Sequence, residues 1–240
     1  MFIGYPRSGH SLVGSLLNAH PDVLIAHELD ALRYIGSGVV GRAQLLSLIV
    51  QAERQFGRSD RHWTGYDYKV PAQWQGRHRV IKVIGDKKGG RSTIRLSERP
   101  ELLQRLQHIV RMPVHLLHVI RNPYDTIATM YQRGHGSIAT CTDRFFVMCA
   151  TNRALRDSAS PPTIDLHLEQ LIDDPQCRLE EVCRRLGLDP THDYLAACAS
   201  IVAPHPHASR FEIQWEEREL VEVARRMSGF AFLQGYTFED

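Results

Sequence analysis

The chain begins with a short apolar run, a tight polar loop and the first turns of a helix, FIGYPRSGHSL at residues 2–12. Leu12, Leu16 and Leu17 recur at helical spacing after the loop. The first N–H groups of a helix have no partner within the helix, and they point toward the preceding loop. Arg7 adds a positive charge there. This pattern predicts a strand, a loop and a helix that bind an anion where they meet, although an ordinary strand-to-helix turn also fits it.

The loop differs from the phosphate-binding loop of nucleotide kinases. The kinase pattern is Gly-x-x-x-x-Gly-Lys-Ser/Thr, in which the lysine follows the second glycine and the hydroxyl group binds magnesium. The loop here holds only Gly9, and its cation, Arg7, precedes that glycine. A loop without the Lys-Ser/Thr pair suits a transferring group that carries less charge than a γ-phosphate.

Residues 6–11, Pro-Arg-Ser-Gly-His-Ser, resemble the 5′-phosphosulfate-binding loop of sulfotransferases that use 3′-phosphoadenosine 5′-phosphosulfate (PAPS). The family pattern is Pro-Lys/Arg-Ser-Gly-Thr-Thr/Ser, so His10 stands in place of a threonine. The resemblance assigns donor binding to Arg7, Ser8, Gly9, His10, Ser11 and Leu12. It also implies that Arg7 offsets charge on the leaving oxygen.

A second segment, VHLLHVIRNPYDTIATMYQR at residues 114–133, predicts a buried strand that ends at Arg121, followed by a helix capped by Asn122 with Pro123 in its first turn. The sulfotransferase pattern has an arginine at this strand end and a serine eight residues later, and both hold the 3′-phosphate. Arg121 and Thr129 have that spacing. A capped helix with a surface arginine would fit this segment taken alone.

A third segment, residues 165–189, resembles the family's Tyr-Glu-Asp-Leu…Asp-Pro…Leu-Gly-Leu pattern. Leu168 replaces the tyrosine that approaches the adenine. The matching residues are Glu169, Leu171, Asp174, Pro175, Leu186, Gly187 and Leu188. Because the three segments follow the family's order, the resemblance covers most of the chain.

The resemblance also suggests the catalytic groups. In the protein-tyrosine sulfotransferase branch, a His-Pro-Asp run precedes a glutamate that accepts the proton of the acceptor hydroxyl, and Glu28 occupies that place. A role for Glu28 in capping a helix stays open, and His27 and His10 are lower-ranked candidates for the base. Lys87 lies in a Gly-Asp-Lys sequence that bacterial relatives carry near the sulfuryl group; a solvated basic turn is the alternative.

Metal and disulfide chemistry are not indicated. The five cysteines form no Cys-x-x-Cys pair. His115 and His118 fall in a predicted strand with odd spacing, so they are expected on opposite faces. His205 and His207 lie between prolines in an expected surface loop. A sulfuryl group carries less charge than a phosphoryl group, so the reaction is expected to need no metal.

Composition and charge indicate the class of protein. A chain of 240 residues with 43% hydrophobic residues can form one domain over residues 1–240, and a net charge of +2 does not favour nucleic acid. No apolar run reaches the roughly 18 residues of a membrane span. The apolar run at the N-terminus leaves no room for a signal peptide, which together with the unpaired cysteines predicts a cytoplasmic protein.

The pattern of apolar residues predicts an α/β fold, a P-loop-like parallel sheet with helices on both faces. Arg7, Asp86 and Arg121 each follow a predicted strand and should gather at one edge of the sheet. The aromatic residues at positions 63, 66, 68 and 74 are expected to line an acceptor pocket or to cover the core. The predicted strands are 2–5, 80–84, 114–120 and 163–166, and the predicted helices are 11–19, 41–56, 98–110, 123–133, 140–157, 175–186 and 216–228.

The predicted activity is transfer of a sulfuryl group from PAPS to a hydroxyl or amine by in-line displacement, with Glu28 as general base and 3′,5′-phosphoadenosine as product. The acceptor is a small molecule, glycan, lipid or peptide, and the sequence leaves its identity and the oligomeric state open. Two alternatives stay open. One is a P-loop nucleotide kinase, and the other is a non-catalytic nucleotide-binding protein, suggested by His10, Thr129 and Leu168.

Overall fold

The computed structural model describes residues 1–38, 40–158 and 160–239. Its strands are β1 (Phe2–Gly4), β2 (Val23–His27), β3 (His62–Trp63), β4 (Tyr66–Asp67), β5 (Val83–Lys87), β6 (Leu116–Ile120) and β7 (Thr163–His167). Its helices are α1 (His10–Asn18), α2 (Ala31–Ser37), α3 (Arg42–Arg58), α4 (Gly90–Glu98), α5 (Glu101–Val110), α6 (Pro123–Gln132), α7 (Ile138–Asp157), α8 (Leu168–Asp173), α9 (Pro175–Arg185), α10 (His192–Ala199) and α11 (Glu217–Met227). Two short 3-10 helices, η1 (Ser209–Glu212) and η2 (Ala231–Leu233), lie near the C-terminus.

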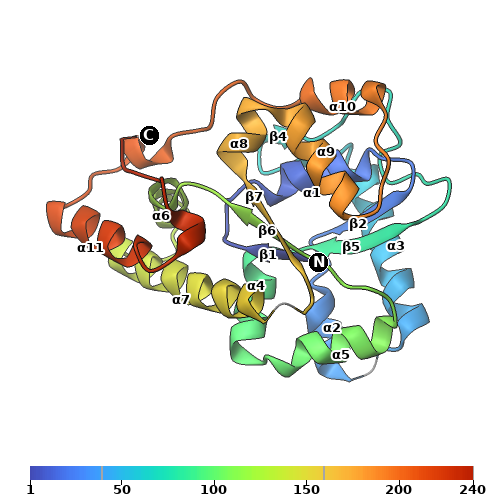
Figure 1. Cartoon of the computed structure of the whole chain (residues 1–240), viewed down its shortest axis with the longest axis horizontal. Coiled ribbons are helices and arrows are strands. Elements are labelled where there is room, and N and C mark those ends of the chain that lie inside the picture. The colour runs from blue at the N-terminus through green and yellow to red at the C-terminus, as the bar shows by residue number, and fades with distance from the viewer. Residues whose placement is uncertain (39, 159, 240) are drawn as a thin grey trace.

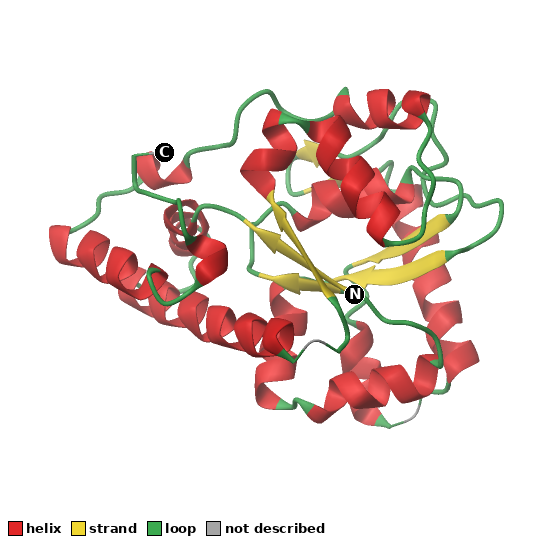
Figure 2. Cartoon of the chain, in the orientation of Figure 1, coloured by secondary structure: helices red, strands yellow, loops and turns green. Residues whose placement is uncertain are grey.

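Parallel strands form the centre of the molecule (Figures 1 and 2). β6 lies between β1 and β7, with Gly4 opposite Val119 in the register. β2 and β5 form a second parallel pair, with Ile25 opposite Gly85. β5 also contacts β1, so the two sets of strands lie side by side. Helices connect successive parallel strands because such strands need a crossover between them.

Helices cover both faces of the strands, as the sequence predicts. Adjacent residues of β1 illustrate this, since successive side chains of a strand point to opposite faces. Phe2 packs in a cluster with residues of α1, α9 and α10. Ile3 packs in another with residues of α2, α3 and α5. A third cluster joins Tyr5 and Ile120 to α6, α7 and the C-terminal segment.

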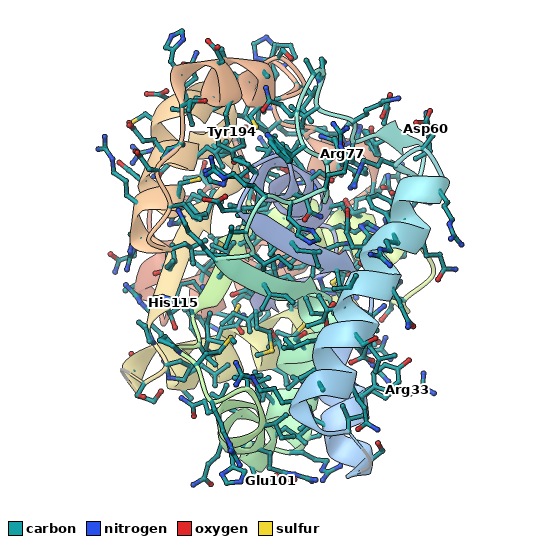
Figure 3. All side chains as sticks on the ribbon, turned by 90° about the vertical axis from the view of Figure 1, so that its right-hand side faces the viewer. Arg33, Asp60, Arg77, Glu101, His115 and Tyr194 are labelled. Atoms are coloured by element: carbon teal, nitrogen blue, oxygen red, sulfur yellow. The ribbon has the colours of Figure 1, made fainter. Side chains whose placement is uncertain are left out.

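Side chains fill the space between these layers, while charged ones such as Asp60 and Glu101 lie at the periphery (Figure 3). Within the residues described, no helix combines the length and apolar character that a membrane crossing needs.

The predicted strand 80–84 is displaced: β5 spans Val83–Lys87, and Val80 is exposed. Pairing with β2 decides this register, residue by residue from Val83 to Lys87. Such pairing is a long-range interaction that local apolar patterning does not report. Several short elements were also missing from the prediction, namely β2, β3, β4, α2, α4, α8 and α10.

Candidate active site

The loop after β1 has the strand-loop-helix geometry predicted for it, with α1 beginning at His10. Arg7 and Gly9 both have a positive φ, 67° and 88°. Gly9 is required, because a Cβ atom there would lie 2.6 Å from Cδ1 of Leu168. The side chain of Leu168 therefore packs directly on the loop. The first turn of α1 holds no acidic residue that would compete for an anion.

The side chain of His10 supports this loop from inside. Its Nε2 lies 3.1 Å from the carbonyl oxygen of Ile3, and its Nδ1 lies 3.1 Å from Oγ of Ser8. The hydroxyl of Ser8 lies 2.9 Å from the carbonyl of Tyr5, so its hydrogen is shared between two acceptors. Burial lowers the pKa of His10 to about 4, and the ring is neutral at pH 7. The role of His10 and Ser8 in binding the donor stays a prediction. Because both side chains bond within the protein, the prediction now concerns their backbone N–H groups.

Gly89 makes room for the His10 ring, which leads to a prediction about stability. Gly89 has a φ of 50°, and a Cβ atom there would lie 2.5 Å from Cε1 of His10. We expect Gly89→Ala to lower the free energy of unfolding by about 2–3 kcal/mol, through backbone strain and overpacking. Denaturant unfolding of the variant measures this loss.

A His10→Ala variant supplies the control. His10→Ala removes the ring with which the new methyl group of Gly89→Ala would clash. The double variant should therefore lose less stability than the sum of the two single losses. Additive losses would show that the ring and Gly89 do not interact.

Lys87 and Lys88 both contact Glu28 at the end of β5. The ammonium group of Lys87, with its side chain 2% exposed, donates to Oε1 of Glu28 at 2.5 Å and to Oγ of Ser11 at 3.0 Å. Nζ of Lys88 contacts Oε2 of Glu28 at 2.5 Å. Burial by itself would raise the pKa of Glu28, but the two lysines outweigh it and hold that pKa below its ordinary value of 4.5. Glu28 is therefore ionised at neutral pH and touches both cations.

His27, a rival candidate for the base, lies among aromatic rings. It stacks on Phe56 with the ring centroids 3.7 Å apart, and it meets the ring of Trp63 edge-on. Burial, followed by the positive charge of Lys87, lowers its pKa to about 3. Its Nε2 lies 3.5 Å from Nζ of Lys87. Among the described residues, the lining of the cleft around Glu28 does not include His27.

Arg121 and Thr129 lie near one another, as their spacing predicts. Both contact the hydroxyl of Ser209, a residue that the sequence did not indicate. The guanidinium of Arg121 donates to the carbonyls of Arg7 (2.9 Å) and His207 and lies 3.3 Å from Oγ of Ser209. Oγ1 of Thr129 lies 3.0 Å from the same Oγ. No local signal marks Ser209, because it comes 80 residues after Thr129 and follows the segment expected to be a surface loop.

Asp125 holds Ser209 in place. Its carboxylate accepts the backbone N–H of Arg210 at 2.9 Å and the Arg210 guanidinium at 2.7 Å. Both side chains are buried. This ion pair fixes η1 against α6, and so it positions the hydroxyl between Arg121 and Thr129.

The expectation that Asp86 joins Arg7 and Arg121 at the edge of the sheet is wrong. Asp86 lies within β5, is buried, and its Oδ2 accepts the backbone N–H of Ala31 at 2.7 Å. It therefore supports the start of α2. The error follows from the displaced register of β5, which makes Asp86 part of the strand.

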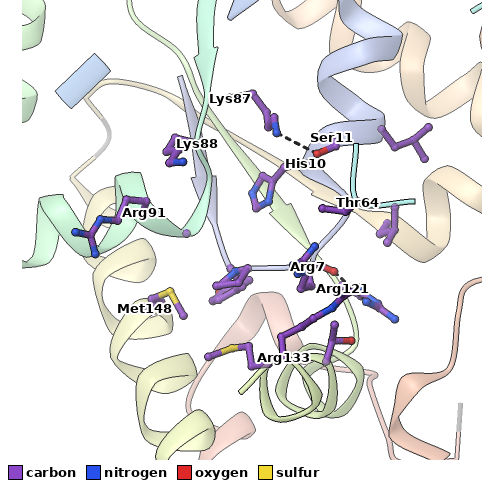
Figure 4. Close-up of a pocket in the computed structure, with 18 of the residues that line it drawn as sticks. Arg7, His10, Ser11, Thr64, Lys87, Lys88, Arg91, Arg121, Arg133 and Met148 are labelled. Atoms are coloured by element: carbon purple, nitrogen blue, oxygen red, sulfur yellow. Dashed lines mark hydrogen bonds between the residues drawn. The ribbon is translucent and has the colours of Figure 1, made fainter. Parts of the chain in front are cut away.

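The predicted residues surround one cleft of about 1490 Å³ (Figure 4). Figure 4 shows Lys87 pointing at Ser11, with Arg7 next to Arg121. Of the predicted site residues, Ser8 alone is absent from the lining; those present are Arg7, Gly9, His10, Ser11, Leu12, Glu28, Lys87, Arg121 and Thr129. Trp63, Tyr66 and Tyr68 also line the cleft, whereas Trp74 does not. Within the described residues, no three His, Cys, Asp or Glu side chains are placed to hold a metal ion.

A model of the sulfotransferase family matches residues 1–193. The chain belongs to the sulfotransferase family. It is an enzyme of sulfuryl transfer, and the kinase alternative is not favoured. A comparison with curated proteins gives no match.

Solved sulfotransferase structures share the fold of this sulfotransferase over nearly its whole length. The sulfotransferase domain of the Synechococcus PCC 7002 olefin synthase has a TM-score of 0.58 and 16% identity, over 95% of this chain and 93% of that one. The sulfotransferase domain from the curacin biosynthetic pathway has a TM-score of 0.56 and 15% identity, over 95% of each chain. A sulfotransferase from Alicyclobacillus acidocaldarius has a TM-score of 0.53 and 16% identity, over 97% and 93%. At these identities the likeness shows the common fold.

Proposed function

We propose that residues 1–240 form a single sulfotransferase domain that transfers the sulfuryl group of PAPS to a hydroxyl or amine acceptor and releases 3′,5′-phosphoadenosine. The observation that carries the proposal is the meeting of Glu28, Lys87 and Ser11 beside the loop that precedes α1. This arrangement joins a proton acceptor and a cation to an anion-binding helix start. A non-catalytic nucleotide-binding protein would need no proton acceptor at this place.

The residues present fit the two anionic ends of this donor. The N–H groups at the start of α1 and the guanidinium of Arg7 suit the 5′-phosphosulfate. Arg121 and Thr129, joined by Ser209, suit the 3′-phosphate. The Nε atom of Arg121 is buried and has no hydrogen-bond partner among the described residues. This N–H group of Arg121 therefore lacks an acceptor in the structure, as expected of a residue that binds an anion.

Glu28 accepts the proton as the acceptor oxygen or nitrogen forms its bond to sulfur. The bond from sulfur to the phosphate oxygen breaks at the same time, and Arg7 and Lys87 offset the charge that develops on that oxygen. A sulfuryl group in the cleft would compete with Glu28 for the two ammonium groups. This competition would release a carboxylate oxygen for the acceptor's proton.

Two further expectations stay predictions. Transfer without a metal ion is expected from the low charge of the sulfuryl group. Location in the cytoplasm is expected because cysteine thiols persist in a reducing compartment, and all five cysteines have free thiols.

Replacement of Arg121 tests the donor assignment. Arg121→Ala should weaken binding of 3′,5′-phosphoadenosine tenfold or more, because a charged hydrogen bond contributes roughly 1.5–3 kcal/mol. Adenosine 5′-phosphosulfate lacks the 3′-phosphate, so its affinity should change much less. Calorimetric titration of both ligands gives the ratio. An equal loss for both would contradict the assignment, since it would indicate general damage to the Arg7 loop that Arg121 supports.

Thermal shifts separate the competing functions. We expect 3′,5′-phosphoadenosine to raise the melting temperature more than ATP with magnesium does. The reverse order would favour a kinase. Transfer of a labelled sulfuryl group from PAPS to an acceptor, with release of 3′,5′-phosphoadenosine, separates an enzyme from a non-catalytic binder.

A further inference from the structure

One part of the cleft lies beyond the residues that fit the donor. Pockets that enclose a drug-sized ligand measure about 300–1,000 Å³, and this cleft measures about 1490 Å³. The additional lining comes from α4, from the end of α6 and from α7. Figure 4 places Arg91, Met148 and Arg133 around this part, on the side of Arg7 away from Ser11. We call it the acceptor groove, and its defining residues are Arg91, Ile94, Met130, Arg133, Arg144 and Met148.

The floor of the acceptor groove is apolar. Met130 and Met148 line it although each is only 1% exposed, and Ile94 is partly buried beside them. Methionine side chains are flexible and polarizable, so they fit apolar ligands of varied shape. A sugar ring would leave hydroxyl groups without hydrogen-bond partners on such a floor, at a cost in free energy. The floor therefore favours an acceptor with a hydrocarbon or aromatic body over a glycan.

The rim of the groove is positively charged. Arg91, Arg133 and Arg144 are exposed, and none forms an ion pair with another described residue. Arg144 donates to the carbonyl of His135, at 2.8 Å. The guanidinium groups of all three are thus available to an anion.

Most of the nearby acids already have partners. Asp143 pairs with Arg226 at 2.6 Å, and Asp30 pairs with Arg95 at 2.6 Å. Glu212 accepts from Gln132 at 2.9 Å and lies 3.0 Å from Nε2 of His207. Glu98 lines both this cleft and a smaller cavity, in each case together with Arg33 and Arg95. The arginines of the cleft that have no ion pair among the described residues outnumber these two acids. The net charge left at the rim is therefore positive, and it attracts an anionic ligand.

We propose that the acceptor is an anionic amphiphile, a molecule with a hydroxyl or amine group, an apolar body and a carboxylate, sulfate or phosphate group. The apolar body lies on Met130, Met148 and Ile94, and the anionic group binds the arginines of the rim. This inference rests on the proposed function, because only a transferase has an acceptor. The binding preference of the groove can be tested without turnover.

Two fluorescent probes that differ by one sulfonate group test the groove. The anionic probe is 1-anilinonaphthalene-8-sulfonate, and the neutral probe is N-phenyl-1-naphthylamine. We expect the protein to bind the anionic probe at least tenfold more tightly. Arg91→Ala and Arg133→Ala should each weaken the anionic probe about threefold, the size expected for an exposed charge pair, and should leave the neutral probe unchanged. Arg54→Ala, an exposed position on α3 outside the cleft, is the matched control and should change neither affinity.

Equal affinities for the two probes, or unchanged affinity of the anionic probe in both rim variants, would overturn the inference. The titrations are repeated with saturating 3′,5′-phosphoadenosine, and both ligands should bind together. Displacement of the probe would place it in the donor part of the cleft, which also overturns the inference. Binding of the nucleotide is measured separately by thermal shift, so failure of the proposed donor would be seen as a different result.

Discussion

Replacement of Glu28 by glutamine is expected to lower kcat 100-fold or more and to leave the affinity for 3′,5′-phosphoadenosine within about threefold. Glutamine keeps the size of the side chain but cannot accept a proton, and general bases contribute about 10²–10⁴-fold to rate. Steady-state kinetics at saturating donor, together with calorimetric titration of the product nucleotide, measure both quantities. A loss in kcat without a loss of affinity would indicate an interaction made in the transition state.

His27→Phe is the matched control, because phenylalanine keeps the stacking against Phe56 while removing both ring nitrogens. We expect this variant to retain kcat within about tenfold. A large loss in His27→Phe with near-normal rates in Glu28→Gln would identify the histidine as the base. The assignment of Glu28 would then be wrong.

The pH dependence of kcat/KM, which reports the ionisation of the free enzyme, follows from the same geometry. Glu28 must be ionised to accept a proton, and Lys87 and Lys88 hold its pKa below 4.5 despite its burial. Activity should therefore be retained at neutral pH and lost only as the pH falls below 4.5. An exposed histidine acting as base would instead lose activity near its ordinary pKa of about 6.5. Since burial lowers the pKa of His27 to about 3, only the substitutions separate Glu28 from His27.

Replacement of Lys87 by methionine is expected to lower kcat by about 10²–10³-fold, the usual loss when one group that stabilises developing charge is removed. Methionine has a similar length and suits a buried position. Lys88→Met is the control, because Lys88 contacts Glu28 but not Ser11. We expect Lys88→Met to lower kcat by less than tenfold.

A second measurement distinguishes a catalytic Lys87 from a structural one. Lys87 lowers the pKa of Glu28, so its removal should raise that pKa and move the loss of activity to a higher pH. Unchanged kcat in Lys87→Met would show that the ion pair supports the fold only. A fall in melting temperature without a change in the pH profile would lead to the same conclusion.

The sequence alone was sufficient for the features that depend on neighbouring residues. The loop around Gly9 could be predicted because the strand, the turn and the start of the helix follow one another directly in the sequence. The proximity of Arg121 and Thr129 could be predicted because a spacing of eight residues brings a strand end close to the following helix, although Ser209, which joins them, could not. Membership of the sulfotransferase family followed from such local patterns.

Tertiary structure decided where groups distant in sequence meet. The pairing of β5 with β2 placed Lys87 against Glu28 and buried Asp86, and local patterning shows no trace of that register. Ser209 contacts Arg121 on a segment that the ion pair between Asp125 and Arg210 holds against α6. The acceptor groove likewise joins α4, α6 and α7. Such contacts form when elements that are distant in sequence pack together. The free energy of this packing depends on pairs of residues from different segments, so it cannot be inferred from the sequence of one segment.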